Sequence, residues 1–153
     1  MKILMVASFG GHFVQLQRLY RKIKETSDCS SVEFMFGVSE PNVTIDSCIV
    51  YEITNVHRES GIKQLLKVTR EVFGVIKRSR PDVVISTGAL PGLLFCVIGK
   101  VLGKKVIWVD SMANYQTLSF SGKIAKLFCD VCLTQWEHLA EQDKRLSFWG
   151  KVL

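Results

Sequence analysis

The feature that most constrains the fold is a stretch near the amino terminus in which a short apolar run leads into two glycines and a helix. Residues 3–7 are uniformly apolar, as in a buried parallel strand, and residues 13–23 repeat apolar side chains at helical spacing. Gly10, Gly11 and His12 stand between these two segments. A strand, a glycine turn and a helix in this order form the first half of a βαβ unit, and they predict a parallel sheet.

The same turn predicts an anion site. Glycine has no Cβ, so a ligand can approach the main chain closely at Gly10 and Gly11. The helix that follows directs its unpaired N–H groups and the positive end of its dipole at the same point, where a phosphate or diphosphate would bind. His12, at the mouth, could donate to the anion or accept a proton. A tight turn that carries a surface histidine would contain the same residues, and both interpretations stay open at this point.

The remainder of the chain alternates strands with helices. Further strands are expected at residues 32–37, 48–51, 83–86, 106–109 and 129–134, and helices at residues 61–80, 93–102, 119–127 and 135–144. This alternation predicts an α/β fold with a Rossmann-like, doubly wound parallel sheet, formed as one domain by residues 1–153.

Three loops are expected to meet at the functional site. A second glycine turn at residues 87–92 and a polar loop at residues 110–114 follow predicted strands, as the first glycine turn does. Ligands of doubly wound sheets bind outside the carboxyl ends of the strands. The sequence therefore predicts that these three loops converge there.

Charge and motif content narrow the class of ligand. The net charge of +6 suits an anionic partner such as a membrane surface or a lipid diphosphate. Nucleic acid is not expected, because the aromatic residues lie mostly in apolar runs. A dinucleotide site is disfavoured because the first loop is not G-x-G-x-x-G. Cys129 and Cys132 have C-x-x-C spacing within a predicted strand, but no second pair completes a zinc site, so we expect core cysteines, no metal and no cofactor.

Two helices carry many apolar residues. The residues of the first, at 61–80, that are predicted to face the core are Ile62, Leu65, Leu66, Val72, Phe73 and Ile76. The second, which begins at residue 93, fits either a buried core helix or an apolar face in the lipid headgroup layer. Its membrane-contacting residues would be Leu93, Leu94, Phe95, Lys100, Lys104 and Lys105. The longest apolar run, residues 89–99, is too short to span a bilayer, so peripheral association with the cytoplasmic face of the cell membrane is expected.

Five segments together carry a family resemblance along nearly the whole chain. They are SFGGHFVQL, STGALPG, VIWVDSMANYQTLSFSGKIAK, LTQWEHLA and FWGKVL. In this set the sequence resembles bacterial polysaccharide-biosynthesis proteins of the PssD and CpsF type. Those proteins are related to the membrane-associated subunit of the eukaryotic two-subunit N-acetylglucosaminyltransferase that extends dolichol-diphosphate-GlcNAc, and more distantly to the amino-terminal half of MurG.

The resemblance implies a GT-B glycosyltransferase divided between two chains. This chain would hold a polyprenyl-diphosphate-linked sugar at the membrane, and a separate donor-binding subunit would bind the nucleotide-sugar. The implied activity is an inverting sugar transfer in capsule or exopolysaccharide biosynthesis, and this chain alone would be inactive. The alternative is a self-contained nucleotide- or phosphate-binding Rossmann-like protein.

The resemblance also implies roles for individual residues. His12 would be either a general base or a cationic ligand of the acceptor diphosphate. The acceptor-diphosphate site as a whole would comprise Gly10, Gly11, His12, Thr87, Gly88, Asp110, Ser111 and Asn114. Asp110 and Ser111 stand where the related proteins usually have Glu-Ser, and Asn114 where they often have arginine. The partner chain would be gripped by Phe148, Trp149, Val152 and Leu153. A tail packed on its own domain as an edge strand is the other interpretation of this last set.

Overall fold

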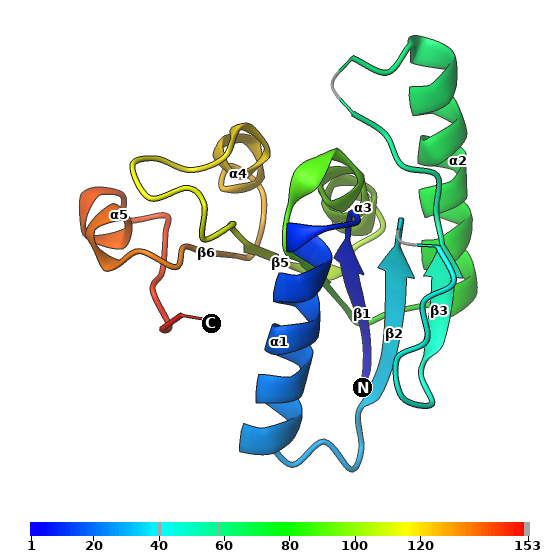
Figure 1. Cartoon of the computed structure of the whole chain (residues 1–153), viewed down its shortest axis with the longest axis horizontal. Coiled ribbons are helices and arrows are strands. Elements are labelled where there is room, and N and C mark those ends of the chain that lie inside the picture. The colour runs from blue at the N-terminus through cyan, green and yellow to red at the C-terminus, as the bar shows by residue number, and fades with distance from the viewer. Residues whose placement is uncertain (40, 58, 152–153) are drawn as a thin grey trace.

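The computed structural model describes residues 1–39, 41–57 and 59–151, and every strand in it belongs to one sheet (Figure 1). The order is β3-β2-β1-β4-β5-β6, with all neighbours parallel. The strands are β1 (Lys2–Ala7), β2 (Glu33–Val38), β3 (Ile49–Glu52), β4 (Val83–Ser86), β5 (Lys105–Val109) and β6 (Val131–Leu133). The predicted doubly wound parallel sheet is confirmed.

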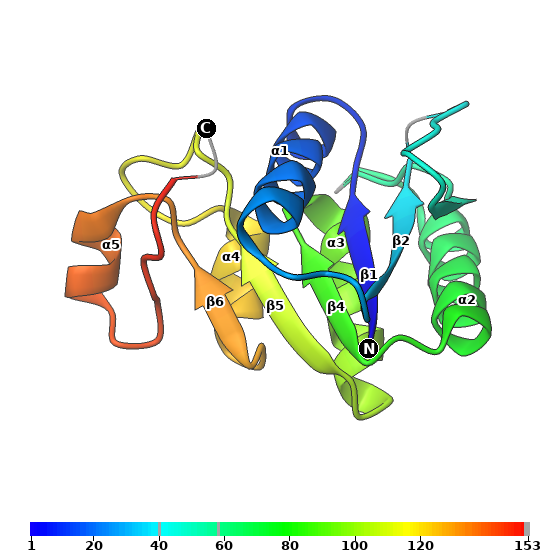
Figure 2. The same cartoon turned by 90° about the horizontal axis from the view of Figure 1, so that it is seen from below.

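Helices cover both faces of this sheet (Figure 2). They are α1 (Gly11–Thr26), α2 (Ile62–Ser79), α3 (Ala89–Val101), α4 (Phe120–Ala125) and α5 (Glu137–Gln142). Because neighbouring side chains of a strand point to opposite faces, Ile3 and Met5 of β1 pack in the core beside α1. Leu4 and Val6 pack in a second core beside α2 and α3. The central strands are buried on both sides, which explains their continuous apolar sequence.

The inward face of α2 differs from the prediction. Ile62, Leu66 and Phe73 are exposed, at 77%, 54% and 45% of their accessible surface. The helix instead buries the stripe formed by Val68, Val72, Val75, Ile76 and Ser79. Apolar residues occupy more than one side of this helix, so helical spacing does not single out the side that contacts the sheet. Three large apolar side chains are left at the surface.

The structure also corrects the predicted membrane face of α3. Leu93 and Phe95 are buried in the core, at 7% and 0% exposure, so they do not contact a membrane. The helix packs against β1, β4 and β5, so this side of it faces the sheet. The exposed apolar residues of α3 are Val97 and Val101. Lys100 is held by an ion pair with Asp130, with Nζ 2.6 Å from Oδ1.

The carboxyl-terminal tail is partly packed and partly exposed. Ser147 forms a single parallel bridge with Leu133: its N–H donates to the Cys132 carbonyl and its own carbonyl accepts from Thr134 N–H, both at 3.0 Å. Leu146 is buried, whereas Trp149 is 70% exposed. Val152 and Leu153, also predicted to grip a partner, lie outside the described residues.

The cysteine prediction is corrected in one detail. Cys129 precedes β6, so the C-x-x-C spacing does not lie within a strand as expected. Cys96 and Cys132 are buried, and burial raises the pKa of the Cys132 thiol to about 12. Cys132 is therefore a protonated core residue at neutral pH.

Candidate functional site

Two glycine turns lie at the carboxyl edge of the sheet, each at the start of a helix. Gly10 precedes α1 with φ 77°, and Gly88 precedes α3 with φ 129°, both in the region that favours glycine. Among the residues that the structure describes, no side chain caps the start of either helix. The first N–H groups of α1, from Gly11 to Phe13, and those of Ala89 and Leu90 in α3 therefore have no partner within their own helix.

His12 and Thr87 join these two turns by reciprocal hydrogen bonds. His12 Nδ1 lies 2.9 Å from the Thr87 carbonyl, and Thr87 Oγ1 donates to the His12 carbonyl at 2.8 Å. A carbonyl oxygen can only accept, so His12 carries its proton on Nδ1, and in the neutral ring Nε2 keeps its lone pair. Gly88 lies against the same ring, where an added Cβ would come within 2.6 Å of Nδ1. Thr87 is fully buried and its hydroxyl is used in this contact, so it positions His12 and does not face a ligand.

Asp110 is likewise a positioning residue, contrary to the expectation that it faces the acceptor. Its carboxylate is 1% exposed and accepts hydrogen bonds from Trp108 Nε1 at 3.1 Å and from Ser119 N–H at 2.9 Å. The Ser119 hydroxyl also donates to it, at 2.5 Å, and caps the start of α4. These bonds fix the loop between β5 and α4.

The main-chain carbonyl of Asp110 connects the loop after β5 with α1 and with the segment after β6. It accepts a hydrogen bond from Gln15 Nε2 of α1 at 3.2 Å and from Gln135 Nε2, after β6, at 3.0 Å. Together with the His12–Thr87 bonds, these contacts bring the three predicted loops to one edge of the sheet. The sequence-based expectation of their convergence is confirmed.

One cavity lies between α1 and the loops that follow β5 and β6; we call it the β5-side cavity. Its volume is about 250 Å³ and its lining includes Gly11, Gln15, Arg18, Ser111, Met112 and Gln135. Gly11 and Ser111 were predicted as site residues, and Asn114 closes the adjacent turn by donating its N–H to the Ser111 carbonyl at 3.1 Å. Gln15 and Arg18 were not predicted, because their positions within a helix give no sign that they face a loop.

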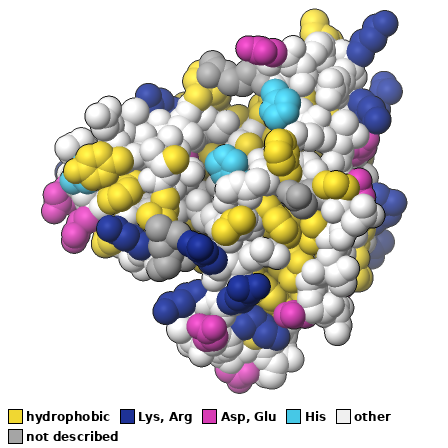
Figure 3. Space-filling model, in the orientation of Figure 1, with side chains coloured by type: hydrophobic (Ala, Val, Ile, Leu, Met, Phe, Trp, Pro, Cys, Tyr) yellow, Lys and Arg dark blue, Asp and Glu magenta, His cyan; other side chains and the backbone are white. Residues whose placement is uncertain are grey.

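A second cavity, the β3-side cavity, lies between the residue that follows β1, the start of α3, α4 and the segment after β3. Its volume is about 350 Å³ and its lining includes Ser8, Asn55, Val56, His57, Leu90 and Ser121. Histidine side chains are exposed on this face of the molecule beside hydrophobic ones (Figure 3).

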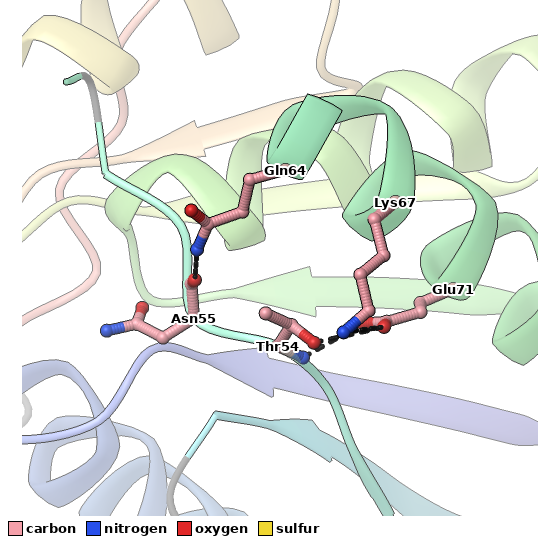
Figure 4. Close-up of polar contacts among 5 residues, drawn as sticks. All are labelled: Thr54, Asn55, Gln64, Lys67 and Glu71. Carbon is pink, nitrogen blue, oxygen red and sulfur yellow. Dashed lines mark hydrogen bonds and ion pairs between the residues drawn. The ribbon is translucent and has the colours of Figure 1, made fainter. Parts of the chain in front are cut away.

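The segment after β3 is held in place by α2 (Figure 4). Glu71 accepts from Thr54 N–H at 2.9 Å and from Thr54 Oγ1 at 3.0 Å, and Gln64 Nε2 donates to the Asn55 carbonyl at 2.9 Å. Lys67 Nζ lies 3.8 Å from the Glu71 carboxylate. The segment after β3, which forms one wall of the β3-side cavity, is therefore fixed against α2.

Sequence comparison identifies the family. Residues 52–152, about two thirds of the chain, match the profile described as "Oligosaccharide biosynthesis protein Alg14 like". The chain belongs to this Alg14-like family. It is similar to the UDP-N-acetylglucosamine transferase subunit ALG14 of Mus musculus, with 26% identity over all of this chain and 83% of that protein. It is also similar to the Schizosaccharomyces pombe subunit of the same name, with 40% identity over 47% of this chain and 37% of that protein.

Solved structures show where else this fold occurs. The Alg14-like chain superposes on MurG from Acinetobacter baumannii with a TM-score of 0.71 and 14% identity, over 90% of this chain and 42% of MurG. It superposes equally well on UDP-GlcNAc 2-epimerase from Neisseria meningitidis, with a TM-score of 0.71 and 9% identity, over 99% of this chain and 47% of the epimerase. The chain therefore has the fold of slightly less than half of these proteins.

Proposed function

We propose that this Alg14-like chain is the acceptor-binding subunit of a two-subunit inverting glycosyltransferase. It would hold a polyprenyl-diphosphate-linked sugar, and a second chain would bring the nucleotide-sugar. The observation that carries the proposal is the match of the whole chain to proteins that are themselves named subunits of a UDP-N-acetylglucosamine transferase.

The shape of the site supports a second chain. The glycine turns and both cavities lie at one edge of a single sheet, whereas the superposed MurG is more than twice as long as its matching part. Glycosyl transfer needs a cleft that excludes water. A donor-binding chain that covers this edge would form the other wall of such a cleft.

In the proposed chemistry the two helix starts bind the acceptor and His12 handles its proton. The unpaired N–H groups at the starts of α1 and α3 would bind the acceptor diphosphate and so orient its sugar. The acceptor hydroxyl oxygen would bond to the anomeric carbon of the donor while the bond from that carbon to the nucleoside diphosphate breaks. His12 Nε2 would take the hydroxyl proton, because Nδ1 is committed to Thr87. In the alternative role, a protonated His12 would bind the diphosphate as a cation.

We propose further that the protein associates peripherally with the cytoplasmic face of a membrane through the α2–α3 groove. This groove, of about 330 Å³, is lined by Thr69, Arg70, Phe73, Ile98, Val101 and Leu102. Lys and Arg side chains project along the edge of the molecule where α2 lies (Figure 3). Within the described chain no helix combines the length and apolar character that a membrane span requires. Apolar side chains framed by basic ones suit a surface of anionic lipid.

The biological setting that we propose is capsule or exopolysaccharide biosynthesis, as in bacterial proteins of the PssD and CpsF type. A self-contained nucleotide- or phosphate-binding protein is the competing function. The competing function predicts that this chain binds a nucleotide or phosphate without a partner. The subunit function predicts a stable complex with a donor-binding chain.

Co-purification tests the proposal. We would express the chain with the Rossmann-like product of an adjacent reading frame that carries a nucleotide-sugar site, with an affinity tag on one of them. A stoichiometric complex that survives gel filtration supports the subunit function. If the two proteins elute separately, and this chain alone binds free nucleotides, the competing function is supported instead.

A further inference from the structure

The β5-side cavity is lined by a largely buried glutamine whose side-chain oxygen accepts no hydrogen bond from the described residues. Gln15 is 92% buried, and its amide nitrogen is committed to the Asp110 carbonyl, which can only accept. Its Oε1 therefore points away from that carbonyl, and the described residues offer it no hydrogen bond. No fully buried side-chain oxygen or nitrogen in the described chain lacks a partner, so Oε1 reaches solvent, and the cavity is the space that Gln15 lines. An amide oxygen in this setting accepts from a ligand hydroxyl or N–H group.

The side chain of Arg18 brings a positive charge to the same cavity. Arg18 is three residues beyond Gln15 and seven beyond Gly11, so the three share one face of α1. Helical side chains lean toward the amino terminus of their helix, which directs Arg18 back over the cavity that it lines. Among the described residues no carboxylate pairs with Arg18. Its guanidinium is free for an anion, and its fork of N–H donors suits phosphate oxygens.

The cavity thus presents a phosphate-binding end and a hydroxyl-accepting side. Gly11 and the uncapped start of α1 add N–H donors to the guanidinium, and Ser111 adds a hydroxyl whose oxygen already accepts from Ala113 N–H at 3.3 Å. Neither a bare phosphate nor an uncharged sugar would use all these groups. A phosphate joined to a sugar would.

We propose that the β5-side cavity binds the phosphate–sugar junction of the acceptor, with Arg18 paired to a phosphate oxygen and Gln15 Oε1 accepting a hydrogen bond from the sugar. This assignment rests on the proposed acceptor-binding function and adds two residues to it. It places the sugar on the α1 side of the His12–Thr87 contact, within the space bounded by the loops after β5 and β6.

Binding measurements on the full chain in mild detergent test the assignment. The probes are farnesyl diphosphate bearing N-acetylglucosamine, farnesyl diphosphate itself, and inorganic pyrophosphate. Arg18→Gln should weaken binding of all three about tenfold or more, as expected for a lost charged hydrogen bond. Arg18→Lys should restore part of the loss. Arg21→Gln is the matched control, because it removes the same charge from a likewise exposed position on α1 that does not line the cavity.

Gln15→Met provides the second readout. It should abolish the preference for the sugar-bearing probe over farnesyl diphosphate while leaving the affinity for pyrophosphate unchanged, with unfolding monitored in parallel. Equal losses in Arg18→Gln and Arg21→Gln would overturn the assignment but leave acceptor binding intact. If the unaltered chain binds none of the probes, acceptor binding itself is overturned.

Discussion

His12 and Gly88 show how closely the two glycine turns depend on each other. The His12 ring occupies the position that a side chain at residue 88 would need, and its Nδ1 is fixed by the neighbouring Thr87 carbonyl. Gly88 also has a φ of 129° that an L side chain rarely adopts. Its role is therefore double, since it allows both the turn and the placement of the imidazole.

Gly88→Ala should displace the His12 ring as well as strain the backbone. Gly103→Ala is the matched control, because Gly103 also has a positive φ, of 71°, but has open space where its Cβ would lie. We expect Gly103→Ala to lower the free energy of unfolding by about 1–2 kcal/mol, the usual effect of a left-handed backbone. Gly88→Ala should lower it by at least about 1 kcal/mol more. Equal unfolding midpoints in urea would contradict the contact with His12.

At the scale of the elements, Asp130 fastens the ends of α3 and β5 together. Its carboxylate accepts from Lys100 Nζ at 2.6 Å and from Val106 N–H at 2.8 Å. The bond from Lys100 is the main cause that holds the pKa of Asp130 below its usual range. A carboxyl group with a lowered folded-state pKa stabilises the fold above its unfolded pKa, and this contribution is lost as pH falls through the folded value.

Asp130→Asn should therefore lower the free energy of unfolding at neutral pH but have little effect on it in acid. Because the side chain is 38% exposed, we expect a loss of at most about 1 kcal/mol at pH 7 in low salt. The difference from the unaltered chain should shrink as pH falls below the ordinary Asp pKa of 3.8. Lys100→Gln should show the same pH dependence. A difference that stays constant from pH 7 to pH 3 would show that the pair does not contribute.

The exposed apolar residues of α2 and α3 make the membrane proposal testable. Phe73→Glu places a charge in the α2–α3 groove without disturbing the core, because Phe73 is already 45% exposed. It should reduce binding to vesicles that contain anionic lipid several-fold. Ile49→Glu, at a similarly exposed position on β3, should leave vesicle binding nearly unchanged. If both variants bind as the unaltered chain does in a flotation assay, the groove is not the membrane-contacting surface.

The order of the elements was predictable from sequence, but their faces were not always. Buried parallel strands are short apolar runs, so β1, β4 and β5 were found to within one residue. In α2, however, apolar residues lie on more than one side, and contact with the sheet decides which are buried. Ile62, Leu66 and Phe73 therefore stayed outside, although their spacing suited a core.

The site was predictable in position and only partly in its residues. A parallel sheet places the loops after β1, β4 and β5 together, which is why Gly11, His12 and Ser111 were expected at one edge of the sheet, where they lie. Whether a polar residue faces the ligand or the protein depends on its partners. Asp110 turned inward because Ser119 and Trp108 supply donors there. Arg18 and Gln15 gave no signal because they lie within a helix, where spacing alone does not show which polar side chains face a loop.

At the scale of the whole molecule, the exposed tail is the candidate contact with a second chain. Trp149 is 70% exposed, and aromatic residues at such positions often dominate the energy of an interface. Trp149→Ala should prevent capture of a donor-binding partner while the unfolding temperature of this chain changes little. Phe73→Ala, which removes an exposed aromatic from α2, should leave capture intact. A large loss of stability in Trp149→Ala would show that the tail belongs to the core of its own subunit.

A transfer assay measures whether sugar transfer needs both chains. The measured quantity is the rate at which a labelled sugar moves from a nucleotide-sugar to a polyprenyl-diphosphate-linked sugar, with this chain alone, with the donor-binding chain alone, and with both. We predict no measurable transfer by either chain alone and steady turnover by the pair, which His12→Ala should abolish or reduce strongly. Robust turnover by this chain alone would contradict the account.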